Sequence, residues 1–239
     1  MKVLFFTFLL VAVGADVLPP QYLEDKYNTR EQRIVTNQIK KAIEQLSKDI
    51  KDAGLDPLEV DQYEVSTSPV PILVTISAFV ESLSFTGASN IAINRLDYGA
   101  LTNRLRFDIS LPQIRLSIGD AGVKANVFGT SYTGQLKGNI EITQLRLAGE
   151  IRMNVGIISG ISIRSVEVNF RMQKIQSAWT LIVQDKDYSA EVNTILNEMI
   201  PELLETFKDI IDKNLSDLIK EVGNQILEKS LFIDADVTV

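Results

Sequence analysis

Two kinds of hydrophobic pattern follow one another in this sequence, and together they restrict the folds it can adopt. From Ile72 to Val183 apolar and polar residues alternate, which is typical of half-buried antiparallel strands. From Ser189 to Leu231 apolar residues recur at helical spacing and form one wide stripe. A helix of about 40 residues is ~60 Å long, so it can cover the apolar face of a long sheet. We therefore predict an α+β fold, with a curved antiparallel sheet packed against a long C-terminal helix.

Three local signals refine this prediction. Thr29 followed by Gln32 has the spacing of a capping box, so an amphipathic helix is expected over Thr29–Ala53, with Gly54 ending it. The segment from Ser66 to Pro71 has the composition of a hinge before the first strand. Pro201 lies inside the C-terminal stripe and is expected to kink or split that helix.

The N-terminus has the pattern of a secretory signal peptide. Lys2 precedes an apolar run from Val3 to Val13, and Val13 and Ala15 are small residues at the positions that signal peptidases favour. The run is too short to span a bilayer. We predict a signal peptide over 1–15, a single mature domain over 16–239, and a secreted, extracellular protein.

Composition excludes several kinds of chemistry. The 239 residues include no cysteine and no histidine, which removes cysteine and histidine nucleophile systems and the commonest metal ligands. We therefore predict no enzyme activity, no cofactor and no metal. The closest acidic pairs, which lack calcium-loop spacing, are Asp185 with Asp187, Asp209 with Asp212, and Asp234 with Asp236. A formal net charge of −7 argues against nucleic acid and against tight docking on anionic membranes.

The order of these elements and several short phrases resemble a known family. The phrases are Gly54-Leu55-Asp56-Pro57-Leu58, Gly138-Asn139-Ile140-Glu141-Ile142, the segment from Tyr188 to Leu204, and the segment from Leu218 to Leu227. Together they resemble the insect juvenile-hormone-binding and takeout proteins and the related mite group 7 allergens. The resemblance covers nearly the whole mature chain. It implies the tubular lipid-binding architecture, in which a strongly curved antiparallel sheet wraps around a long helix.

The resemblance also implies a function. Members of the family carry terpenoids, fatty acids, pigments or other elongated lipids, without a cofactor and without chemistry. Takeout and juvenile-hormone-binding proteins usually have a cysteine pair near the mature N-terminus, and this chain has none. That difference argues against juvenile hormone itself as the ligand and favours the cysteine-poor branch.

An apolar tunnel between the sheet and the C-terminal helix is the predicted binding site, with the N-terminal helix as a cover or plug. Burial of an alkyl chain gains ~0.8 kcal/mol per CH₂, which is enough to hold a long lipid. For each candidate lining residue, ordinary core packing is the alternative. The candidates are Phe107, Phe128, Tyr132, Phe170, Met172, Trp179, Met199, Leu203 and Phe207.

Two other classes of function remain open at this stage. The amphipathic C-terminal helix would also suit a surface-active or host-defence protein that spreads at interfaces or on microbial lipids. A packed interior with exposed apolar patches would instead favour a protein-interaction module. Asn214-Leu215-Ser216 is a sequon that makes Asn214 a candidate for glycosylation.

Overall fold

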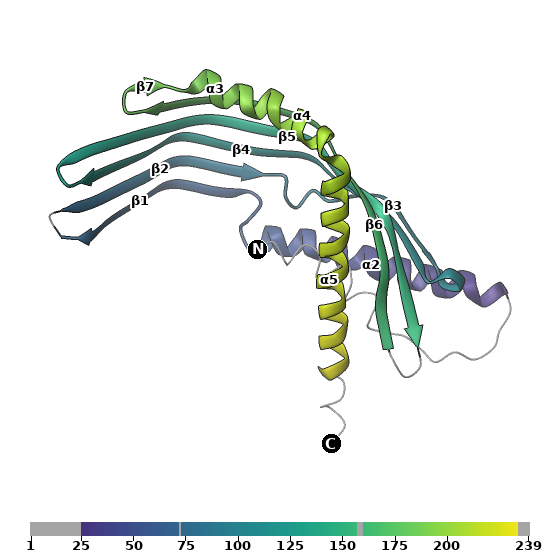
Figure 1. Ribbon diagram of the computed structural model, residues 1–239. Helices are drawn as coiled ribbons and strands as arrows, with labels where there is room; N and C mark the ends of the chain where they lie inside the picture. Colours follow the sequence, from purple (N-terminus) through teal and green to yellow (C-terminus); the bar gives the residue numbers. More distant parts are fainter. Residues whose placement is uncertain (1–24, 72, 157–159, 234–239) are drawn as a thin grey trace.

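The computed structural model describes residues 25–71, 73–156 and 160–233. The predicted signal peptide and the pair Asp234 and Asp236 lie outside these residues. In chain order the elements are α2 (Asp25–Asp52), β1 (Leu58–Val70), β2 (Val74–Thr86), β3 (Ala92–Gly99), η1 (Ala100–Thr102), β4 (Arg104–Val127), β5 (Thr130–Gly156), β6 (Gly160–Val183), β7 (Lys186–Asp187), α3 (Ser189–Thr194), η2 (Ile195–Met199), α4 (Ile200–Thr206) and α5 (Lys208–Ile233). The α+β class with a long antiparallel sheet and terminal helices is confirmed (Figure 1).

All described strands belong to one antiparallel sheet in the order β1-β2-β4-β5-β6-β7, with β3 paired to β4. Strands β4, β5 and β6 are 24, 27 and 24 residues long, and their hairpins run the length of the sheet. Several glycines lie inside these strands. Gly138, for example, has a φ of 135° within β5. A Cβ there would lie 2.1 Å from the carbonyl oxygen of Ala178, so only glycine fits.

Strand β1 was not predicted. Its second half, Ser66–Val70, was interpreted as a hinge, but it pairs with β2 through contacts such as Thr67↔Ile76 and Val70↔Val74. From Asp61 onward every residue of β1 is exposed. An edge strand that buries neither face has no alternation to detect, which explains the error.

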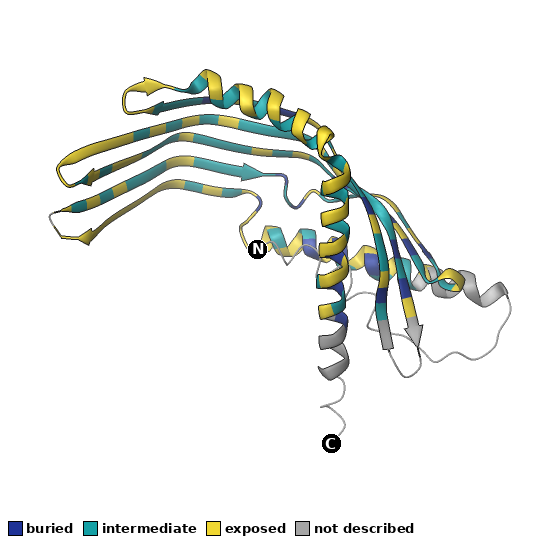
Figure 2. Cartoon of the chain, viewed as in Figure 1, coloured by how far each residue is buried: buried dark blue, intermediate teal, exposed yellow. Residues whose placement is uncertain are grey.

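The hydrophobic core lies at one end of the sheet, which we call the proximal half (Figure 2). There α2 and α5 cover the apolar face of β3, β4, β5 and β6. The most buried side chains of this core are Ile39, Leu105, Ile151 and Ile219, each less than 2% exposed. The other end, the distal half, carries mostly half-buried and exposed residues and, within the described chain, no cluster comparable to this core (Figure 2).

The N-terminal helix starts earlier than predicted. Because α2 already includes Asp25, Thr29 lies inside the helix, and the capping box predicted there is wrong. The end of the helix agrees with the prediction. Gly54 has a φ of 67°, and the N–H of Leu55 donates to the carbonyl of Ile50 at 3.0 Å, which is the long hydrogen bond of a Schellman ending.

The C-terminal segment is helical, as predicted, but it is not one rod. The π-helical turn η2 precedes Pro201, and the N–H of Ile200 bonds to the carbonyl of Ile195. Proline removes a helical donor, and the wider turn accommodates that loss. The break between α4 and α5 falls six residues later, at Phe207, whose φ and ψ are −101° and 17° (Figure 1).

Candidate functional site

The C-terminal helices contact the sheet mainly through its edge strand β6. Six backbone N–H groups of β6 donate to side chains on these helices instead of to another strand. The pairs are Leu181 to Ser189 (3.0 Å), Trp179 to Asn193 (2.8 Å), Ser177 to Asn197 (2.6 Å), Phe170 to Asp212 (2.7 Å), Val168 to Ser216 (3.1 Å) and Ile163 to Asn224 (2.6 Å). We call this set the edge ladder. It satisfies an edge that would otherwise expose unpaired groups.

The edge ladder works because two periodicities match. Moving two residues along a strand advances about 6.6 Å, and moving four residues along a helix advances about 6 Å. Ser189, Asn193 and Asn197 are therefore in step with every second residue of β6, and so are Asp212 and Ser216. Three of the side chains also return a bond: the amides of Asn193, Asn197 and Asn224 donate to the carbonyls of Trp179, Ser177 and Ile163.

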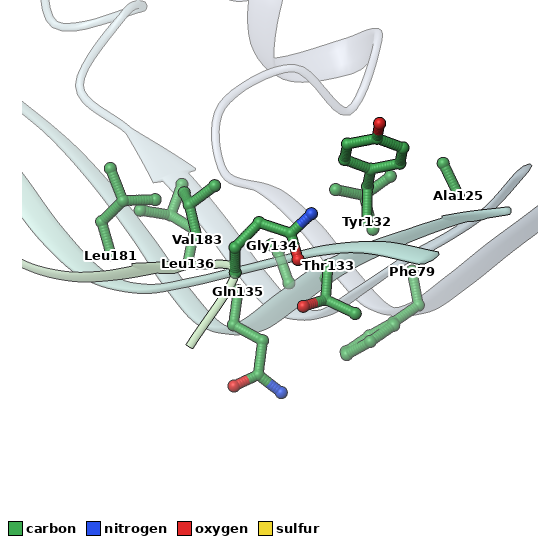
Figure 3. A pocket seen from close by; sticks show the side chains of 13 residues that line it. Phe79, Ala125, Tyr132, Thr133, Gly134, Gln135, Leu136, Leu181 and Val183 are labelled. Carbon is green, nitrogen blue, oxygen red and sulfur yellow. The ribbon is translucent and has the colours of Figure 1, made fainter. Parts of the chain in front are cut away.

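With the helices held on the edge, the distal half keeps an apolar face. Its residues share one register across four strands: Ala78, Val123 and Gly134 are aligned, and Gly134 is aligned with Val183. Figure 3 shows Ala125, Tyr132, Leu136, Leu181 and Val183 on one side of the sheet, and Phe79, Thr133 and Gln135 on the other. We call the first set, with its β2 neighbours, the distal apolar face. It consists of Val74, Ile76, Ala78, Val80, Ala121, Val123, Ala125, Val127, Tyr132, Gly134, Leu136, Leu181 and Val183.

An open pocket of about 490 Å³ lies at this end of the sheet. None of the described residues that line it is charged, and they include Ala121, Val123, Tyr132, Leu136 and Leu181 (Figure 3). A second depression of about 730 Å³ shares part of this wall but also includes Glu64, Lys124 and Asp185. Because a hydrophobic ligand requires an uncharged lining, the first pocket is the better candidate site.

The helices next to this pocket carry an apolar stripe that the edge ladder does not use. Ile195, Met199, Leu203 and Phe207 follow one another at intervals of four residues and are 44–47% exposed. Their neighbours on the helix surface, Val192, Leu196, Ile200 and Leu204, are half-buried. A helix that binds the sheet edge through polar groups thus keeps much of its apolar surface accessible.

The predicted lining residues fall into separate environments. Phe107 and Trp179 are buried, at 3% and 7% exposure, and Phe107 belongs to the proximal core. Phe170 and Met172 are half-buried on β6. Tyr132 lines the open pocket, and Met199, Leu203 and Phe207 lie on the exposed helical stripe. Phe128 lies at the end of the β4–β5 hairpin and is 73% exposed.

The pocket also contains residues that sequence analysis missed. Leu136, Leu181 and Val183 line it on the distal apolar face, together with small residues of β4, and Phe79 contributes from the other side of the sheet. Alternation alone marks such residues as half-buried, but it does not distinguish a face covered by a helix from one left open. The useful signal was the small side chains Ala121 and Ala125, which leave room above the sheet.

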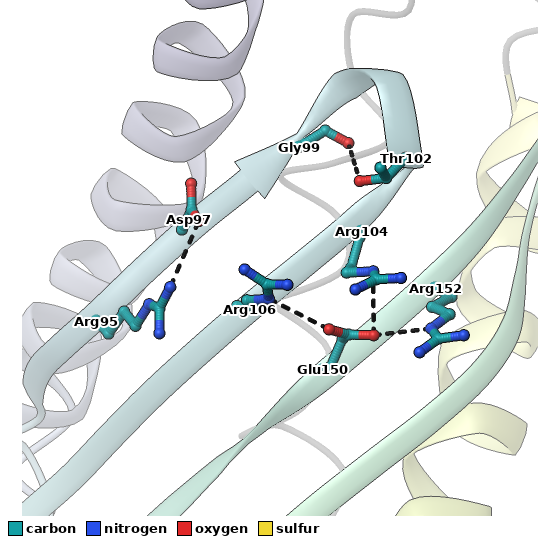
Figure 4. Close-up of polar contacts among 8 residues, drawn as sticks. All are labelled: Arg95, Asp97, Gly99, Thr102, Arg104, Arg106, Glu150 and Arg152. Atoms are coloured by element: carbon teal, nitrogen blue, oxygen red, sulfur yellow. Dashed lines mark hydrogen bonds and ion pairs between the residues drawn. The ribbon is translucent and has the colours of Figure 1, made fainter.

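The charged groups of the proximal half form a separate cluster on the polar face. Glu150 accepts from Arg152 at 2.7 Å and forms ion pairs with Arg104 at 3.2 Å and Arg106 at 3.3 Å (Figure 4). Burial raises the pKa of Glu150, but the hydrogen bonds from Arg152 and Arg106 outweigh burial and hold this pKa below its ordinary value. The cluster is far along the strands from the pocket and has the geometry of a structural ion network.

Two members of the acidic pairs noted in the sequence, Asp187 and Asp212, have hydrogen-bond partners in the structure. Asp187 accepts from the N–H of Ser189 at 2.8 Å, and Asp212 accepts from the N–H of Phe170 and from the Lys208 ammonium. Over the described parts of 25–233, no group of three or more acidic side chains is placed to hold a metal ion.

Comparison with known proteins identifies the family. The model of the haemolymph juvenile hormone binding protein family matches residues 3–233. The chain belongs to this family. The resemblance found in the sequence is thus confirmed, and the family is one of binding proteins that carry hydrophobic ligands, not of enzymes. Its description places its members in haemolymph, an extracellular fluid.

Solved structures give further similarities for this juvenile hormone binding protein family member. Takeout 1 of Epiphyas postvittana is 12% identical, over 87% of this chain and 91% of that one, with a TM-score of 0.27. A lipopolysaccharide binding protein is 10% identical, over 80% of this chain and 36% of that one, with a TM-score of 0.24. No curated protein sequence matches the chain. Among the described helices, none is long and apolar enough to cross a membrane.

Proposed function

We propose that this protein is a secreted carrier that binds one elongated hydrophobic molecule on the distal apolar face, between the sheet and the helical stripe of η2 and α4. A terpenoid, a fatty acid, a pigment or a similar lipid is the ligand class. The observation that carries the proposal is the pocket of about 490 Å³ with an uncharged lining in a family of hydrophobic-ligand carriers.

The energetics favour such a ligand. Each buried CH₂ gains ~0.8 kcal/mol, and the protein surface that the ligand covers gains about 25 cal/mol per Å². Val123, Tyr132 and Val183 are 46%, 50% and 39% exposed, so each still has apolar area to lose on binding. Met199 and Leu203 have similar exposure on the helix, and a thioether adapts to irregular ligands. In this proposal the sheet forms the floor of the predicted tunnel and the helical stripe forms its wall.

Two residues of β5 provide a matched test. Leu136 lines the pocket, whereas Asn139 is exposed on the opposite side of the strand and is not among the described lining residues. We expect Leu136→Glu to weaken binding of a fluorescent long-chain fatty acid at least about tenfold, because a carboxylate would be desolvated against the ligand. Asn139→Glu adds the same charge outside the pocket and is expected to bind like the native protein. Equal loss of binding in both variants would contradict the proposed site.

The natural ligand is accessible to native mass spectrometry. Protein purified from the medium of secreting cells is expected to carry an added mass that organic extraction releases. Absence of any such mass, combined with no binding of hydrophobic probes, would refute the carrier function. The same spectra test secretion, because removal of 1–15 would leave a mature chain that begins at Asp16.

Asn214 is proposed to carry a glycan in the secreted protein. It is exposed on α5, whereas the sequon's Ser216 faces the sheet and accepts from Val168 at 3.1 Å. A sugar on Asn214 therefore leaves the edge ladder intact. A mass decrease on treatment with an N-glycosidase, abolished by Asn214→Gln, is the expected result. An unchanged mass would contradict this assignment.

A further inference from the structure

The distal end of the sheet has a composition unlike the rest of the chain. Charged residues make up 23% of the sequence, yet 65–80 and 125–136 contain none. These two segments form the ends of the β1–β2 and β4–β5 hairpins. Glu64 and Glu81 bound the first segment, and Lys124 and Lys137 bound the second.

The two hairpin ends lie side by side and expose apolar side chains (Figures 1 and 2). The N–H of Phe128 donates to the carbonyl of Leu73 at 2.8 Å, and Val74 pairs with Val127. Phe128, Leu73 and Val70 are 73%, 46% and 44% exposed. We call these three residues the tip patch. It protrudes from the molecule, whereas a ligand pocket is concave.

Phe128 occupies a backbone conformation that its residue type does not favour. Phe128 and Gly129 have φ values of 50° and 83°, and they form a two-residue turn between Val127 and Thr130. Such a turn favours Asn-Gly, because both central residues have positive φ. Packing within the chain does not explain a strained phenylalanine that is 73% exposed. A contact outside the chain would explain it.

The backbone groups at the two hairpin ends are hydrogen-bonded in a way that suits contact with a surface of low polarity. The N–H of Leu73 donates to the carbonyl of Val70 at 3.1 Å, and the hydroxyl of Ser68 donates to the carbonyl of Val74 at 2.9 Å. With the bond from Phe128 to Leu73, these contacts pair backbone groups that would be costly to leave unpaired away from water.

From these observations we infer that the tip patch docks the protein on a phospholipid surface. Val70, Leu73 and Phe128 enter the interfacial layer of the bilayer, and the long stem of Lys124, three residues from Val127, reaches the phosphate level from the side. A fluid surface accepts protruding side chains without a matching cavity, and the absence of charge removes the cost of desolvating ions. The ligand pocket lies at the same end of the sheet, but docking does not require a bound ligand.

The test measures co-flotation with phosphatidylcholine vesicles. The double variant Leu73→Asn and Phe128→Asn is expected to lower the partition coefficient about tenfold or more, since two large apolar side chains leave the interface. Leu101 is 81% exposed on η1, which lies next to Arg104 at the start of β4, whereas the tip patch lies beyond Val127 at the end of that strand. Leu101→Asn makes the same exchange there and is expected to leave partition unchanged. Addition of phosphatidylserine should alter partition of all variants alike.

A second variant separates docking from folding. Asn fits the left-handed turn better than Phe, so Phe128→Asn alone should melt no lower than the native protein while it loses partition. Phe128→Trp should keep binding and show quenching by brominated lipid. Failure of the native protein to float, or equal loss with Leu101→Asn, would overturn the inference. So would a native dimer, detected by light scattering without lipid, that the tip variants dissociate.

Discussion

The side chain of Asn193 replaces a strand neighbour for Trp179. Its amide oxygen accepts from the N–H of Trp179 at 2.8 Å, and its amide nitrogen donates to the carbonyl of the same residue at 2.7 Å. One helical side chain thus provides the two bonds that the next strand of a sheet would make. The same exchange recurs at Asn197 with Ser177 and at Asn224 with Ile163.

Removal of this side chain should destabilise the fold. We expect Asn193→Ala to lower the free energy of unfolding by about 2–3 kcal/mol, because two part-buried backbone groups lose their partners. Urea denaturation measures the change. Asn37→Ala, at an exposed position of α2, is the matched control and should change stability by less than about 0.5 kcal/mol. Similar losses in both variants would show that helix propensity, and not the edge ladder, sets the effect.

Asp56 should give the protein an acid-dependent stability. This buried carboxylate accepts from the N–H of Gly87 and from the N–H and hydroxyl of Ser89. Burial raises the pKa of Asp56, but these hydrogen bonds outweigh burial, so the pKa lies below its ordinary value of 3.8. Because the folded-state pKa is the lower one, the stabilisation is complete well above pH 3.8 and is lost as the pH falls through the folded value.

The corresponding experiment compares urea midpoints between neutral and acidic pH. Asp56→Asn should cost about 2–3 kcal/mol near pH 7, since an amide cannot accept all three bonds, and much less at the acidic end. Asp61→Asn, exposed on β1, should follow the native protein throughout. A cost for Asp56→Asn that stays constant with pH would contradict the assignment.

Neutralisation of Glu150 should make the stability of the proximal half depend on salt concentration. Glu150→Gln leaves Arg104, Arg106 and Arg152 close together without a carboxylate between them (Figure 4). We expect the variant to be less stable at low ionic strength and to recover as salt screens the repulsion. Thermal melts across a sodium chloride series measure this. A deficit that does not change with salt would mean that lost hydrogen bonds dominate.

Gly138 should be intolerant of a side chain. Gly138→Ala places a Cβ 2.1 Å from a backbone oxygen at a φ of 135°, so β5 and β6 must separate locally. A loss of about 2–4 kcal/mol is expected, from strain and broken pairing. In Gly134→Ala the nearest atom is a Val123 methyl group at 3.2 Å, which can move, and the cost should be much smaller. Equal costs would contradict this explanation.

Periodicity was sufficient to predict the regular parts of the fold. The alternation of Leu105, Phe107 and Ile109 marks a strand with one buried face, and the stripe of α5 marks a helix. Gly54 was identified correctly as a helix end because few other residues adopt its conformation. The strong curvature of the sheet and its wrapping around the helix remain predictions, as does the tunnel.

Tertiary relations were beyond the reach of periodicity. The spacing of Ser189, Asn193 and Asn197 was visible in the sequence, but polar residues on a helix normally indicate a solvated face. The register between a helix and a strand edge became evident only with both in place. The break at Phe207 was likewise assigned to Pro201, because proline was the visible disruption and the π-helical turn that accommodates it was not.

The apolar character of the candidate site was predicted from the sequence, but several of its lining residues were not. Tyr132 and the stripe of Met199, Leu203 and Phe207 were named, while Leu136, Leu181 and Val183 were overlooked in favour of aromatic residues. The candidate lining residues were chosen by the size of their side chains. Solvent accessibility, not size, distinguishes a side chain that faces a ligand from one that packs in the core. Phe107 illustrates the difference, since it is large and apolar but is packed within the proximal core.

The β6 margin of the sheet is covered by helical side chains and the β1 margin is not, and this difference affects self-association. Side chains from the C-terminal helices close the β6 margin, whereas β1 pairs only with β2 among the described strands and keeps an edge to which a foreign strand can add. Strand β1 carries Glu59, Asp61 and Glu64 and no cation. Two copies of the protein that pair through their β1 strands therefore repel each other at neutral pH. Replacement of all three carboxylates by amides should remove this repulsion, and fibrous growth of that variant is expected to begin at its β1 margin.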